Sequence, residues 1–206
     1  MLPEYLKTHK YYLDEEYSER MPEVVVLRMS YMFMINYNYL VIDRVNNQSV
    51  IIDPAWDMDK IEQAIMSNRV SLNGILLTHA HPDHTHLAKP LAAKHNCPIW
   101  MSHEEIAISG YNAPQLTGID TTPWPVGQLL VQPIFTPGHT SGSLCYLIGD
   151  NLFTGDTLFA EGCGICDSTQ DAHSMFASNG ALKKGYLTPE NKKFYPGHSY
   201  GKHQAN

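Results

Sequence analysis

The sequence has few cysteines, few charged residues and no long apolar run. Four cysteines among 206 residues do not indicate a fold built on disulfides. No stretch reaches the ~18 consecutive apolar residues that suggest a membrane-spanning helix. Residues 1–20 contain no apolar core of a secretory signal. We therefore expect a cytoplasmic protein with no membrane partner.

Basic residues are fewer than acidic ones. The chain has 14 lysines and arginines and 21 aspartates and glutamates, which gives a net charge of −7. Proteins that bind nucleic acid usually present a basic face, so we expect no nucleic-acid partner. The composition is 43% hydrophobic and 17% charged, which excludes a disordered chain. This length predicts a single domain over residues 1–206, in which residues 1–20 form an N-terminal extension.

Alternating and apolar runs predict an α/β fold with strands grouped towards both ends of the chain and helices interleaved. Such a pattern favours two central sheets with helices outside them. The predicted strands cover residues 23–29, 32–43, 49–53, 74–77, 98–101, 128–135, 143–148, 151–154 and 193–195. The predicted helices cover residues 58–70, 84–94, 104–109 and 175–184, with Pro90 expected to kink or split the second.

Histidine is abundant, with 11 in the chain, and three of them cluster directly after an apolar strand. Residues 78–84 read THAHPDH. His79 and His81 can point to one side of a nearly extended chain, whereas Asp83 and His84 follow the bend at Pro82. Four such side chains after a buried strand argue against a chance cluster on a polar loop. Imidazole and carboxylate groups bind zinc, and also iron or manganese, so this spacing favours two adjacent metal ions.

Three later segments share one pattern: an apolar strand is followed by a turn and then by one side chain that can bind a metal. They are TPGHT with His139, FTGDT with Asp156 and YPGH with His198. Glycine permits the sharp turn and close packing beside an ion. The sequence therefore predicts a dinuclear metal centre where strands end. Its expected ligands are His79, His81, Asp83, His84, His139, Asp156 and His198.

Taken together, these motifs resemble the metallo-β-lactamase superfamily, and most closely its glyoxalase II-type thioester hydrolases. The resemblance implies an αββα sandwich with two Zn²⁺ ions at one edge of the two central sheets. It assigns one ion to His79, His81 and His139, assigns the other to Asp83, His84 and His198, and makes Asp156 the bridge.

A narrower resemblance links the N-terminal segment and residues 161–167, EGCGICD, to the zinc-dependent hydrolases of bacterial trans-acyltransferase polyketide clusters of the bacillaene type. Ile165 stands where glyoxalase II has an arginine, and no C-terminal helical domain follows His198. Both departures argue against a glutathione thioester as the physiological substrate. We expect Cys163, Ile165 and Tyr200 to contact substrate. A redox pair or a metal knuckle formed by Cys163 and Cys166 is the alternative.

The expected reaction is hydrolysis of an acyl thioester carried by an acyl carrier protein, coenzyme A or glutathione, in polyketide and antibiotic biosynthesis. A hydroxide shared by the two ions would attack the carbonyl carbon, with Asp83 and Asp156 as the catalytic carboxylates. Asp53 ends its strand near the expected cleft and is a candidate for supporting a ligand. A carrier protein, being acidic, would need a basic patch. The candidates are Lys183, Lys184, Lys192, Lys193 and Lys202.

Three other functions use the same sequence features differently. A persulfide dioxygenase of this fold would need one iron held by two histidines and one carboxylate. A metal-dependent nuclease fits the acidic chain poorly, and a non-catalytic binding module does not account for a complete ligand set. Metal analysis separates the first from the hydrolase, because hydrolysis would use two zinc ions.

Overall fold

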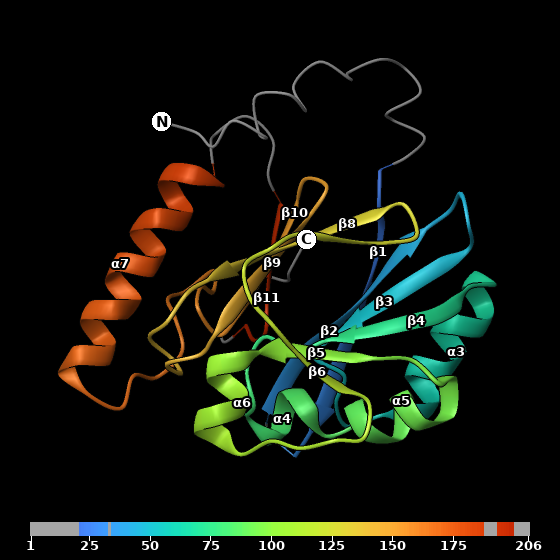
Figure 1. Cartoon of the computed structure of the whole chain (residues 1–206), viewed down its shortest axis with the longest axis horizontal. Helices are drawn as coiled ribbons and strands as arrows, with labels where there is room; N and C mark the ends of the chain where they lie inside the picture. The colour runs from blue at the N-terminus through green and yellow to red at the C-terminus, as the bar shows by residue number, and fades with distance from the viewer. Residues whose placement is uncertain (1–20, 33, 188–192, 200–206) are drawn as a thin grey trace.

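Two sheets pack face to face between two layers of helices in the computed structural model, which describes residues 21–32, 34–187 and 193–199 (Figure 1). The first sheet has the order β1-β2-β3-β4-β5-β6, with strands Glu23–Tyr31, Met34–Asp43, Gln48–Ile52, Ser71–Leu76, Ile99–Ser102 and Leu116–Ile119. The second sheet has the order β11-β10-β9-β8-β7, with strands Lys193–Pro196, Asn151–Gly155, Leu144–Ile148, Leu129–Phe135 and Trp124–Val126. This arrangement confirms the expected αββα sandwich. The predicted N-terminal extension, residues 1–20, lies outside the described residues.

The two-sided burial of β2 explains why the sandwich has a core on each face of the first sheet. Leu40 and Ile42 point to the helix side, whereas Tyr39 and Val41 point to the other sheet. Side chains alternate across a strand, so a continuous apolar run is buried on both faces. The same alternation in β9 sends Tyr146 to the core between the sheets.

Helices cover the outer face of each sheet. On the first sheet lie α3 (Met58–Asn68), α4 (Pro82–Thr85), α5 (Ala88–His95) and α6 (His103–Ser109) (Figure 1). On the second sheet lies α7 (Thr169–Gly185), whose Leu182 packs against Leu147 and Leu152. No helix among the described residues is long and apolar enough to cross a membrane.

The directions of the strands bring the carboxyl ends of β4, β8, β10 and β11 to one edge of the sandwich. β3, β4, β5 and β6 run parallel to one another, as do β10 and β11. β9 is antiparallel to both of its neighbours, β8 and β10, so β8 also runs in the direction of β10. Functional groups commonly lie beyond the carboxyl ends of such strands. The segments that follow β4, β8, β10 and β11 carry the predicted ligands.

The structure differs from the predicted elements in three places. Strands β6 and β7 were not predicted, and α7 begins at Thr169 rather than at residue 175, because Ser168 accepts a hydrogen bond from the Asp171 N–H and caps it. The helix predicted over residues 84–94 is split, as expected, although the break between α4 and α5 falls at residues 86–87, before Pro90. Pro90 lies in the first turn of α5, where its missing N–H has no partner within the helix.

Candidate metal centre

Seven side chains from both sheets converge at this edge of the sandwich. They form three overlapping groups, and within each group the nitrogen and oxygen atoms that can bind a metal lie within 4.8 Å of one another. The first group is His79, His81 and His139, and the second is Asp83, His84 and His198; the third, His79, His84 and Asp156, overlaps both. Every ligand predicted from the sequence therefore belongs to the cluster.

In the first group, three imidazoles turn one nitrogen each towards a common centre. His79 Nε2 lies 3.1 Å from His81 Nδ1, and His139 Nε2 lies 2.9 Å from the same atom. The opposite nitrogen of His139 is 2.7 Å from the Ile165 carbonyl oxygen. That carbonyl can only accept a hydrogen bond, so Nδ1 carries the proton and Nε2 keeps its lone pair for the centre.

The second group combines two imidazoles with a carboxylate. His198 Nε2 lies 3.2 Å from both His84 Nε2 and Asp83 Oδ2. His198 Nδ1 is 2.8 Å from the Ile35 carbonyl oxygen, so Nδ1 donates a hydrogen bond on the side away from the centre and Nε2 faces the centre.

Asp156 lies between the two groups. Its Oδ1 is 3.3 Å from His84 Nε2, and its Oδ2 is 3.4 Å from His139 Nε2 and 3.5 Å from His198 Nε2. Oδ1 is buried and has no hydrogen-bond partner in the described part of the chain. A buried carboxylate oxygen without a partner is costly, so this atom needs a cation or a proton donor.

The charges of the cluster favour a cation. Burial, together with the neighbouring imidazoles, holds the pKa of His79 well below its usual value, so this ring is neutral and can donate its lone pair. Burial also opposes charge on His84, but the carboxylates of Asp156 and Asp53 raise its pKa to about 9. The same field of negative charge that attracts a proton to His84 would attract a metal ion.

Asp53 contacts His84 of the second group on the side of the ring that points away from the centre. It is 2% exposed, and its Oδ2 lies 3.0 Å from His84 Nδ1. Asp53 also accepts hydrogen bonds from the Thr78 N–H at 2.8 Å and from the Thr78 hydroxyl at 2.7 Å. The carboxylate therefore fixes the ring of His84 and the chain segment that leads to His79, as its place at a strand end had suggested.

Two supporting residues were missed in the sequence. The Asn36 side-chain amide donates to Asp83 Oδ2 at 3.1 Å and to the Asp83 carbonyl at 3.0 Å, while Trp56 Nε1 donates to the Asn36 side-chain oxygen. Glu105 accepts from the Ala80 N–H at 2.8 Å. A signal for Asn36 was present, since it is a polar residue within the predicted strand over residues 32–43, which is mostly apolar and aromatic. Glu105 gave no such signal.

Gly197 lets the β11 turn approach the cluster closely. A Cβ atom at this position would lie 2.5 Å from Asp156 Oδ1 and 2.7 Å from His84 Cε1. Both distances are too short for real contacts, and both partners are buried, so an added methyl group must displace one of them.

We expect Gly197→Ala to lower the metal content and the activity of the purified protein while leaving it folded. Metal analysis and a thermal unfolding curve measure the two effects. Gly180→Ala is the matched control, because nothing lies within 4 Å of a Cβ added there. Full metal content in Gly197→Ala would contradict the proposed role of this turn.

A cavity of about 630 Å³ opens from the cluster to solvent. Its walls include the ligand candidates His81, Asp83, His139, Asp156 and His198 and the residues Met34, Ile35, Phe159, Cys163, Gly164, Ile165 and Asp167. Cys163 and Ile165, both predicted to contact substrate, thus line the cleft. The third such residue, Tyr200, lies outside the described residues, as do Lys192 and Lys202 of the predicted basic patch.

Two other histidines and the cysteine pair lie outside the ligand cluster. His86 is exposed, and its Nδ1 is 3.3 Å from the Trp56 backbone nitrogen. His95 pairs with Glu62 at 2.9 Å. Cys163 and Cys166 are free thiols that belong to none of the metal-binding groups among the described residues.

Comparison with known proteins assigns a class to this fold and cluster. The family model of the metallo-beta-lactamase superfamily matches residues 34–198, and the chain belongs to that superfamily. It is 40% identical over 181 residues, covering 87% of this chain and 80% of the other, to the "Probable polyketide biosynthesis zinc-dependent hydrolase BaeB" of Bacillus velezensis. It is 34% identical to a hydroxyacylglutathione hydrolase of Alkalilimnicola ehrlichii, over 82% of this chain and 63% of that one.

Among solved structures, ETHE1 from Myxococcus xanthus superposes with a TM-score of 0.72 at 28% identity. The match covers 87% of this chain and 77% of that chain. Membership of the superfamily and the names of the two relatives support a hydrolase.

The residues of the cluster fit zinc. Zinc prefers imidazole nitrogen and carboxylate oxygen at about 2.0–2.2 Å in tetrahedral sites, and the cluster offers both types. Nδ1 of His139 and Nδ1 of His198 each donate to a backbone carbonyl, which leaves Nε2 of both rings facing the centre. Asp156 Oδ1, which has no hydrogen-bond partner among the described residues, would gain a ligand.

Proposed function

We propose that the protein is a zinc-dependent thioester hydrolase with two Zn²⁺ ions per chain; iron or manganese can take the same ligands. One ion would be held by one group of residues, the other by a second group, and Asp156 would contact both. The two groups are His79, His81 and His139, and Asp83, His84 and His198. The observation that carries this proposal is the position of the Asp156 carboxylate, 3.3–3.5 Å from ring nitrogens of both groups.

Bound zinc would lower the pKa of water towards neutrality and polarise a carbonyl oxygen. The protein's own part is to orient water and accept its proton, and Asp83 and Asp156 line the cleft for that purpose. Hydrogen bonds from His198 and Asn36 and the charge of His84 hold the pKa of Asp83 well below its usual range, despite partial burial. Asp83 is therefore a carboxylate at neutral pH and can accept a hydrogen bond from the attacking water.

A thioester suits this site because its leaving group needs little help. A thiol has a pKa near ~8.5, so a thiolate departs without a strong general acid. No serine or cysteine nucleophile is required. One relative is named for polyketide biosynthesis and another for hydrolysis of hydroxyacylglutathione, which is a thioester. We therefore propose as the substrate an acyl thioester of a carrier protein, coenzyme A or glutathione, with a role in polyketide and antibiotic biosynthesis in the cytoplasm. The carrier protein would then be a partner.

A mononuclear-iron persulfide dioxygenase is the second candidate, favoured by the structural similarity to ETHE1. One iron would need only two histidines and one carboxylate. The second group, Asp83, His84 and His198, would then have no metal to bind, although three backbone and side-chain contacts hold it in place. The hydrolase uses both groups, so we favour it.

Metal analysis combined with two assays separates these candidates. We expect about two zinc ions per chain and release of free thiol from acyl thioesters, with no oxygen uptake on a persulfide. Removal of metal by a chelator should abolish hydrolysis, and added Zn²⁺ should restore it. One iron per chain with oxygen consumption would refute the hydrolase.

A further inference from the structure

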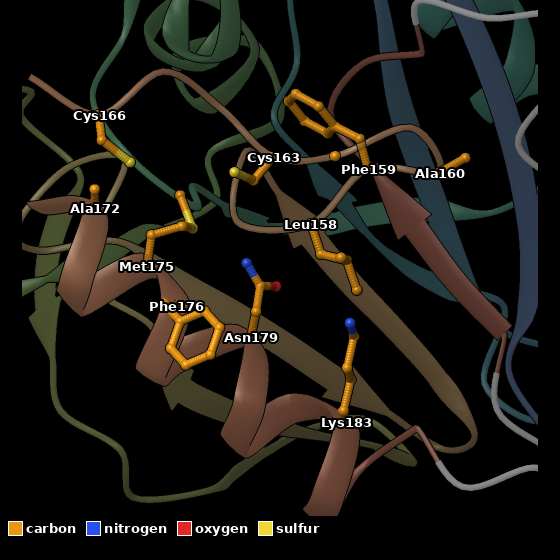
Figure 2. Close-up of a pocket in the computed structure, with 11 residues that line it drawn as sticks. Leu158, Phe159, Ala160, Cys163, Cys166, Ala172, Met175, Phe176, Asn179 and Lys183 are labelled. Atoms are coloured by element: carbon orange, nitrogen blue, oxygen red, sulfur yellow. The ribbon is translucent and has the colours of Figure 1, made fainter.

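A second cavity, of about 490 Å³, lies between α7 and residues 158–166 (Figure 2). Phe159 and Cys163 line both this cavity and the metal cleft, so the two adjoin. The Phe159 ring lies 5.8 Å from the His198 ring, which places this wall beside the metal centre. We call this second cavity the α7 groove.

One face of α7 forms the long wall of the groove. Ala172, Met175, Phe176, Asn179 and Lys183 line it, at the three- and four-residue spacing of one helix face. At 1.5 Å per residue, Met175 and Lys183 are about 12 Å apart along the axis. Figure 2 shows Phe159 and Cys163 at one end of the groove and Lys183 at the other. The groove is therefore elongated, with one end at the metal centre.

The walls are apolar except at two points. Met175 is buried, whereas the Phe176 ring is 83% exposed although it lines the groove. Asn179 lies between the two ends; its amide donates to the Thr157 carbonyl at 3.0 Å, while its Oδ1 is buried without a hydrogen-bond partner in the described residues. An N–H or O–H group of a ligand would satisfy that oxygen.

Lys183 supplies the second polar point. Its side chain reaches into the groove from the last turns of α7 (Figure 2). No carboxylate within the described ranges forms an ion pair with it. A lysine that ends an otherwise apolar groove is suited to the terminal anion of a long, mostly uncharged ligand.

We propose that the α7 groove binds the phosphopantetheine arm of the acyl thioester substrate, with the thioester at the metal centre and the phosphate at Lys183. This inference rests on the proposed thioester hydrolysis and names its substrate class. The arm carries secondary amides that can donate to Asn179 Oδ1, a dimethyl group that can cover Phe176, and a phosphate. An acyl chain of hydrocarbon alone would leave Asn179 and Lys183 unpaired, and glutathione has no phosphate.

Direct binding tests the groove without hydrolysis. The probe is S-methyl phosphopantetheine, a thioether that cannot be hydrolysed and lacks a thiol that could extract zinc. We expect the zinc-loaded wild-type protein to bind it at least about tenfold more tightly than S-methyl pantetheine, which lacks the phosphate, as a charge-assisted hydrogen bond would give. Lys183→Ala should remove that preference. Lys184→Ala, the matched control for charge, should keep it because Lys184 does not line the groove.

Equal affinity for the two probes in the wild-type protein, or an unchanged preference in Lys183→Ala, would overturn the inference. Because no bond is broken, binding can succeed when hydrolysis fails, and the two proposals are judged separately.

Kinetic measurements then distinguish the two possible sources of the phosphopantetheine arm, a carrier protein and coenzyme A. In Lys183→Ala we expect KM for butyryl phosphopantetheine to rise about tenfold while KM for butyryl pantetheine is unchanged. A matching rise with the butyryl carrier protein identifies the carrier as a source that uses the groove. A rise with butyryl coenzyme A alone supports the groove and assigns it to coenzyme A. No rise with any of the phosphate-bearing substrates contradicts the inference.

Discussion

Asp156→Asn is expected to lower bound zinc from two ions to one or fewer and to lower kcat at least about a hundredfold. The substitution keeps the shape of the side chain but removes the charge that lies between the two groups of ligands. His84, His139 and His198 all lie within 3.5 Å of this carboxylate, so its loss affects both groups at once. Metal analysis and thioester hydrolysis measure the two effects.

Asp150→Asn is the control for this experiment. It makes the same change of charge at an exposed residue of the turn between β9 and β10, away from the cluster. We expect the control to keep both ions and full activity. Two firmly bound zinc ions in Asp156→Asn would contradict the bridging position of this residue.

Asp53→Asn is expected to weaken zinc binding about 10–100-fold, although Asp53 belongs to none of the groups of candidate ligands. His84 Nδ1 donates its proton to the Asp53 carboxylate, which leaves Nε2 to face the centre. An amide nitrogen in that position would donate to Nδ1 and move the ring proton to Nε2, where it blocks metal binding. Competition with a zinc chelator measures the affinity.

The choice of asparagine separates positioning from folding. Asp53 has a φ of +51°, in the left-handed region that asparagine tolerates. We therefore expect the melting temperature of the chelator-treated protein to fall much less than its zinc affinity. Asp59→Asn, an exposed residue on α3 with the same change of charge, is the control. A zinc affinity within about twofold of wild type would show that Asp53 does not act through His84.

The sequence predicted the structure correctly where a residue pattern is compatible with a single kind of element or site. The apolar and aromatic residues over 32–43 predicted a strand, and the ligands after four strands predicted a cluster at one edge. The strands β6 and β7 were missed for a local reason. Leu116–Ile119 is short and contains Gly118, while Trp124–Val126 contains Pro125, and such residues weaken the strand pattern at a sheet edge.

Contacts between distant segments were the part that the sequence did not reveal. Asn36 and Asp83 are 47 positions apart, and their hydrogen bonds depend on how β2 lies beside the β4 turn. The α7 groove was missed for the same reason, since its shape comes from the packing of a helix against residues 158–166. The lysines had been singled out only as a surface patch, whereas the structure separates Lys183, which lines the groove, from Lys184, which does not.

Both ligand groups draw on both halves of the sandwich. His79, His81, Asp83 and His84 follow β4 of the first sheet, whereas His139, Asp156 and His198 follow strands of the second. A cation bound by either group would therefore link the two sheets at the edge where the cluster lies. Metal supply would then affect the stability of the folded protein as well as its activity, because an ion at a concentration 100-fold above its dissociation constant adds about 2.7 kcal/mol to the free energy of unfolding.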